Sequence, residues 1–111
     1  VVFKRLPHPP IINGALDDWR PPPLAVLDRD TADWIGGRRP AADNPKIQFW
    51  GGWDATALYL AFCVRDTLVI EGGANQPRQG DSVEIGIDGD NDSFANWFRA
   101  DHQFSITPDG H

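Results

Sequence analysis

The sequence predicts an all-β protein, and a β-sandwich rather than a closed barrel. Several short segments alternate strictly between apolar and polar residues, as half-buried strands do. The composition favours turns over helices, with 14 Asp, 11 Gly and 10 Pro among 111 residues. Helical spacing of apolar residues is absent, and a single helical turn over 94–99 is the most that the pattern allows.

The chain is predicted to begin with an extended lead-in, residues 1–10, followed by one domain over residues 11–111. Prolines at positions 7, 9 and 10 exclude a helix from the lead-in. The pair Asn13-Gly14 predicts a tight turn, because both residue types accept positive φ. A short strand is expected over 24–27, and a long polar surface loop over 28–45.

The clearest strand signals lie in the second half of the chain. Alternation predicts strands over 47–50, 58–64, 83–87 and 103–107, with a shorter one over 68–70. The segment Gly51-Gly52-Trp53-Asp54 is interpreted as the turn between the first two of these strands. The connections 66–80 and 89–100 are expected to be loops.

Charge and composition exclude several classes of function. A net charge of −6 argues against a nucleic-acid partner, which requires a basic face. The chain has no apolar run of the ~20 residues that a membrane span needs, and residues 1–10 do not resemble a signal peptide. A single cysteine, Cys63, excludes an internal disulfide framework and a thiolate zinc cluster.

The most pointed local motif is the acidic segment that follows the predicted strand 83–87. Asp88, Asp90 and Asp92 alternate in a turn, where their oxygens can converge on a hard cation such as Ca²⁺. The sixth and twelfth positions are Ser93 and Arg99, so the segment is not an EF-hand loop. Asp101 is a further candidate ligand. The alternative is an ordinary solvated acidic turn, since Asp is a common turn residue.

Five segments, taken in order, carry a resemblance to a known family. They are Ile12-Asn13-Gly14-Ala15-Leu16-Asp17-Asp18-Trp19, Trp53-Asp54 followed by Leu58-Tyr59-Leu60-Ala61-Phe62, Val64-Arg65-Asp66, Gly80-Asp81-Ser82-Val83-Glu84-Ile85-Gly86-Ile87-Asp88, and Asp101-His102-Gln103-Phe104. In this order the segments resemble the N-terminal part of a family 9 carbohydrate-binding module, within the wider group of DOMON-like sugar- or haem-binding sandwiches.

The resemblance implies a jelly-roll-like sandwich, structural calcium, and two aromatic side chains that clamp a sugar at the reducing end of a chain. Family members usually continue beyond the position of Asp109-Gly110 with several more strands. Three explanations stay open for this chain: a fragment, a shortened domain, or a sheet completed by a partner. Any ligand contact from the second half of the family's domain is therefore unassigned.

Five tryptophans are the candidate sugar-stacking groups, because indole offers a flat apolar face beside polar donors. Trp19 and Trp53 lie beside turns within the resemblance and are interpreted as structural. Trp34, Trp50 and Trp97 are the binding candidates; Trp50 is out of phase with Ile47 and Phe49 and is expected to face away from the core. Hydrogen bonds to sugar hydroxyls are expected from Arg99, Gln48 or Asn96. The alternative for each tryptophan is a structural cover for a sheet.

The residues do not support catalysis. Asp81 stands at the opening of the strand predicted around 83–87, and Glu84 is three residues further on. In period-two geometry the two point to opposite faces, so they cannot act as a glycosidase pair. The three histidines are far apart and form no zinc motif, and haem ligation would rest on His102 alone.

The sequence thus predicts a non-catalytic carbohydrate-binding module that directs a secreted or periplasmic enzyme, or a surface protein, to polysaccharide. The alternative is a structural β-sandwich module of a larger extracytoplasmic protein, oligomerising through its sheet edges.

Overall fold

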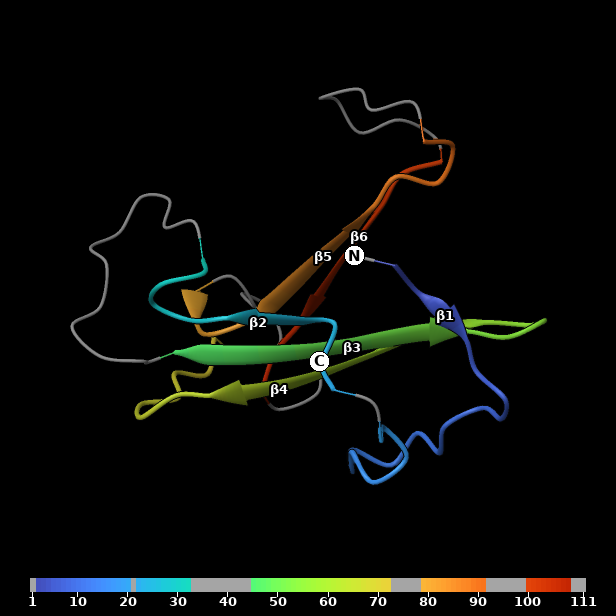
Figure 1. Ribbon diagram of the computed structural model, residues 1–111. Coiled ribbons are helices and arrows are strands. Elements are labelled where there is room, and N and C mark those ends of the chain that lie inside the picture. Colours follow the sequence, from blue (N-terminus) through green and yellow to red (C-terminus); the bar gives the residue numbers. More distant parts are fainter. Residues whose placement is uncertain (1, 21, 33–44, 73–78, 92–99, 109–111) are drawn as a thin grey trace. The chain divides into compact units, whose positions relative to one another are not determined.

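The computed structural model describes residues 2–20, 22–32, 45–72, 79–91 and 100–108, and six strands within these ranges build its sheets (Figure 1). Two units, Val1–Thr67 and Leu68–His111, each hold one sheet. The prediction of an all-β fold is confirmed, and mainly antiparallel sheets are the components of a β-sandwich. The jelly-roll order of the strands stays a prediction. The expected helical turn over 94–99 lies outside the described residues, as does most of the loop predicted over 28–45.

The first unit is a four-stranded sheet built around one long central strand. Its strands are β1 (Lys4–Arg5), β2 (Ala25–Leu27), β3 (Lys46–Trp53) and β4 (Leu58–Arg65). β4 pairs with β3 along its whole length, while β2 and β1 lie beside the first and last parts of β3 (Figure 1). The strands predicted over 24–27 and 58–64 are confirmed. The lead-in, predicted to be extended, contains a short strand, because Lys4–Arg5 pairs in parallel with the end of β3.

Aromatic side chains cover one face of this sheet. Phe49 of β3 stacks on Phe62 of β4, with ring centroids 4.9 Å apart and planes 23° apart. Phe3 meets Phe49 edge to face at 5.9 Å. Offset and edge-to-face pairs are the favoured geometries of aromatic rings. The chain before β1 is thereby fastened to the central strands.

The prediction of a turn at Gly51-Gly52-Trp53-Asp54 is wrong, because β3 continues to Trp53. The two glycines serve close approach instead. A Cβ atom on Gly51 would collide with the ring of Phe3, and one on Gly52 would lie 2.6 Å from Leu6 Cγ. Phe3 and Leu6 therefore pack directly on the backbone of β3, on opposite faces of the strand. The glycines make room for the lead-in rather than reversing the chain.

The turn between β3 and β4 is organised by the carboxylate of Asp54. Its Oδ1 accepts hydrogen bonds from the backbone N–H of Thr56 at 2.7 Å, the Thr56 hydroxyl at 2.7 Å and the N–H of Ala57 at 2.9 Å. Its Oδ2 accepts one from the hydroxyl of Tyr59 at 3.0 Å. These donors, the N–H of Thr56 first, lower the pKa of Asp54 from 3.8 to about 2.

We expect the β3–β4 turn to lose stability in acid. Since the pKa of Asp54 is lowered on folding, its contribution is complete above pH 3.8 and is lost as the pH falls through about 2. Asp54→Asn keeps one acceptor oxygen and removes the charge, so its melting temperature should lie below that of the wild type at pH 7. The difference between the two should narrow as thermal denaturation is repeated from pH 5 to pH 2. A difference in melting temperature that stays constant from pH 5 to pH 2 would contradict the role assigned to Asp54.

The second unit is a two-stranded antiparallel sheet of β5 (Val83–Ile87) and β6 (His102–Ile106). Both strands were expected from the alternation. The strand predicted over 68–70 is wrong, since no strand is present there. The backbone of Ile70 bonds to Asp81 instead: its N–H donates to Asp81 Oδ2 at 2.8 Å, and its carbonyl accepts from Asp81 N–H at 2.7 Å. Asp81 thus fastens this segment to the beginning of β5.

Candidate functional site

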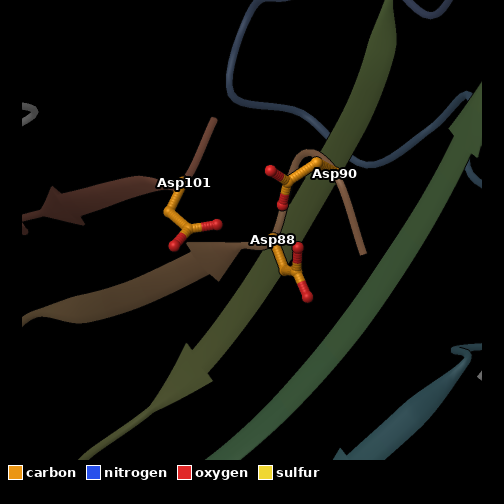
Figure 2. A group of neighbouring side chains, drawn as sticks. All are labelled: Asp88, Asp90 and Asp101. Atoms are coloured by element: carbon orange, nitrogen blue, oxygen red, sulfur yellow. The ribbon is translucent and has the colours of Figure 1, made fainter. Parts of the chain in front are cut away.

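Three carboxylates of the second unit gather at the end of the β5–β6 pair. Asp88, Asp90 and Asp101 each offer an oxygen, and these oxygens lie within 4.8 Å of one another. Figure 2 shows Asp88 directly after β5, Asp90 in the following turn and Asp101 before β6. Asp88 and Asp90 are exposed, whereas Asp101 is half-buried. Like charges this close repel one another, so a cation among them would relieve a real electrostatic cost.

The pairing of β5 and β6 produces this juxtaposition. Ile87 lies opposite His102 in the register, so Asp88 and Asp101 are the next facing positions. The two segments also touch through backbone, because a Cβ atom on Gly89 would collide with the carbonyl oxygen of Ala100. Asn91 adopts a φ of 55°, in the left-handed region that Asn tolerates. The local sequence thus turns the acidic segment back toward β6.

The described structure therefore brings together two of the three predicted metal ligands. Asp88 and Asp90 stand in one cluster, and Asp101, the further candidate, completes it. Asp92 lies outside the described residues. The sequence signal for Asp101 was weak, since it stands 11 positions after Asp90 and only the hairpin register brings the two near each other.

The placement expected for Trp50 is corrected by the structure. Trp50 is only 9% exposed and is the one buried hydrophobic side chain among the described residues. It shares a face of β3 with Gly52, which is also buried and lies under Leu6. Both faces of this central strand are covered, so being out of phase with Phe49 does not turn a side chain to solvent. Gln48, on the same face, is half-buried.

The other candidates for sugar contact cannot be placed. Trp34, Trp97, Arg99 and Asn96 lie outside the described residues. Their proposed roles stay predictions.

Sequence reasoning missed an exposed aromatic side chain at the end of β3. Trp53, interpreted as structural, is 44% exposed. The guanidinium carbon of Arg5 lies 5.8 Å from the centroid of its ring, a cation–π distance. Only the parallel pairing of β1 with β3 brings Arg5 beside Trp53, and a two-residue strand leaves no periodic signal to reveal it.

Comparison with known proteins decides the family. The family model for carbohydrate family 9 binding domain-like proteins matches residues 26–111. The chain belongs to this family. The resemblance seen in the sequence motifs is thereby confirmed. As a family 9 binding domain, the chain is a binding module rather than an enzyme.

A curated relative of this family 9 domain is endo-1,4-beta-xylanase A of Thermoanaerobacterium saccharolyticum. The two are 31% identical over 101 residues, which cover 90% of this chain and 8% of the xylanase. The chain therefore spans a small part of that relative's length. No solved structure matches the chain. Within the described ranges, no helix is long and apolar enough to cross a membrane.

Proposed function

We propose that this family 9 domain binds polysaccharide and, as an accessory module, holds an attached catalytic domain close to that polysaccharide outside the cytoplasm. The family match over residues 26–111 carries the proposal. The xylanase relative supports a plant cell-wall polysaccharide as the ligand, because its name assigns it to β-1,4-xylan cleavage. Net charge −6 disfavours a polyanionic ligand, so the ligand class is a neutral glycan.

Binding would combine ring stacking on tryptophan with hydrogen bonds from polar side chains. Trp34, Trp97 and Arg99 remain the proposed contacts. Gln48 keeps its proposed role, as a half-buried amide on β3. Trp50 is the weakest of the candidates, because 9% exposure leaves little of its ring for a sugar.

A titration of tryptophan fluorescence tests the function. Xylobiose, cellobiose, glucose and their reduced alditols are added to the folded protein, first with calcium and then with EDTA. A saturable shift with affinity between micromolar and millimolar is expected, as for other small, solvated ligands. Loss of the shift on reduction of the sugar would indicate recognition of the chain end. No response to any sugar would overturn the proposal and favour the structural module.

We further propose that the acidic cluster holds Ca²⁺ for a structural purpose. Asp88, Asp90 and Asp101 fit a hard cation, since they supply carboxylate oxygens from two segments that already touch. Asp92 stays a candidate ligand. The ion would tie the turn after β5 to the residue before β6.

Calcium is expected to raise the stability of the domain. With calcium at 100 times its Kd, the free energy of unfolding should rise by about 2.7 kcal/mol. EDTA should reverse the rise in melting temperature. Asp90→Asn should weaken or abolish the calcium effect, whereas Asp17→Asn, a matched exposed carboxylate in the first unit, should leave it unchanged. An equal calcium response in all three proteins would contradict the site.

A further inference from the structure

The strands β1, β3 and β4 meet at one end of the first sheet (Figure 1). A strip of exposed side chains lies there on a single face. Arg5 of β1 faces Trp53 of β3, and Trp53 faces Leu58 of β4, so the three form one row across neighbouring strands. The guanidinium of Arg5 lies over the indole of Trp53, which places both on the same face. Trp53 is 44% exposed, Leu58 is 48% exposed, and Arg5 is also exposed.

A second aromatic ring extends this strip along the strand. Phe3 precedes Arg5 by two positions, so the two side chains point to the same face. Its ring lies over Gly51, two positions before Trp53, and is still 36% exposed. Phe3, Arg5, Trp53 and Leu58 are called the Trp53 strip. Three strands give it a width of about 10 Å.

The chemistry of the Trp53 strip suits a pyranose ring. Indole and phenyl faces accept the apolar C–H face of a sugar, and the guanidinium has five donors for hydroxyl oxygens. Asp54, the residue after Trp53, already accepts four hydrogen bonds from its own turn. Its carboxylate oxygens are thus already engaged within the turn. The net charge of −6 disfavours a polyanion.

We propose that the Trp53 strip is a second carbohydrate-binding surface, which binds internal units of a neutral polysaccharide chain. This inference rests on carbohydrate binding as the proposed function, and adds a site and a binding mode. A row of exposed side chains across three strands contacts the faces of successive sugar rings rather than enclosing a chain end. Binding at this strip therefore does not depend on the reducing end.

The test is a titration of the ¹⁵N-labelled domain with xylohexaose, cellohexaose and their reduced forms, followed by NMR. The indole N–H of Trp53 is assigned by its loss in Trp53→Phe. We expect this resonance to shift equally with native and reduced oligosaccharides. Trp53→Ala should weaken the affinity measured at the remaining resonances of the strip about tenfold, and Arg5→Gln about threefold. Arg65→Gln, an exposed arginine at the other end of the sheet, should leave it unchanged.

Each other outcome overturns the inference. If sugars shift resonances elsewhere and leave Trp53 unmoved, the Trp53 strip is not a binding surface, while the proposed function stands. If no sugar shifts any resonance, both fail. If only native oligosaccharides shift Trp53, the strip recognises chain ends and the proposed mode is wrong. The shifts are measured on the wild-type protein, so the result holds even where Trp53→Ala does not fold.

Discussion

Replacing Trp50 by alanine is expected to lower the free energy of unfolding by about 3–5 kcal/mol, the usual cost of removing a large aromatic side chain from a core. Trp50 is 9% exposed and stands at the centre of the sheet, on the long strand β3. Trp50→Phe fills part of the same volume, so its cost should be smaller. Chemical denaturation with urea measures both changes.

The matched control for Trp50 is Trp53, the same residue type three positions later on the same strand. Because Trp53 is 44% exposed, Trp53→Ala should destabilise the domain much less. The binding interpretation of Trp50 makes the opposite prediction: Trp50→Ala would weaken sugar binding and leave the melting temperature near that of the wild type. Equal denaturation midpoints for the two alanine variants would refute the core assignment.

These two tryptophans show what period-two alternation can predict. Alternation located the strands around 58–64 and 83–87, because large apolar residues recur at every second position in each. On β3 it identified two faces but not that both of them are covered. Phe49 and Trp50 are adjacent and both bulky, so the pattern is symmetric in this strand. Whether each face is covered depends on Phe3 and Leu6, which belong to the lead-in and are far from β3 in the sequence.

The candidate metal cluster likewise depends partly on local spacing and partly on the pairing of segments that are distant in the sequence. Asp88 and Asp90 were predicted from local spacing, since turn residues two apart can point to one side. Asp101 joins them through the register of β5 and β6, which a one-residue slip would change completely. Sequence alone suggests Asp101 as a ligand, but its distance to the others comes only from the pairing.

The glycine pair in β3 gives the second large expected effect. Gly51→Ala should lower the free energy of unfolding by about 2 kcal/mol, because the new methyl group occupies the position of the Phe3 ring. Displacing Phe3 also breaks its edge-to-face contact with Phe49. The N–H of Leu6, which donates to the carbonyl of Trp53 at 2.8 Å, should then exchange faster with solvent, since β1 is held less firmly.

A double-mutant cycle separates this mechanism from a general intolerance of β3 to change. If the cost of Gly51→Ala arises from Phe3, it should largely disappear in a Phe3→Ala background, where the methyl group has room. Additive effects of the two substitutions would show instead that the glycine is needed for the strand itself. The distinction matters for the Trp53 strip, because the same packing that seats Phe3 on Gly51 brings Arg5 over Trp53. Gly51→Ala should therefore weaken sugar binding at the strip even though residue 51 contacts no ligand.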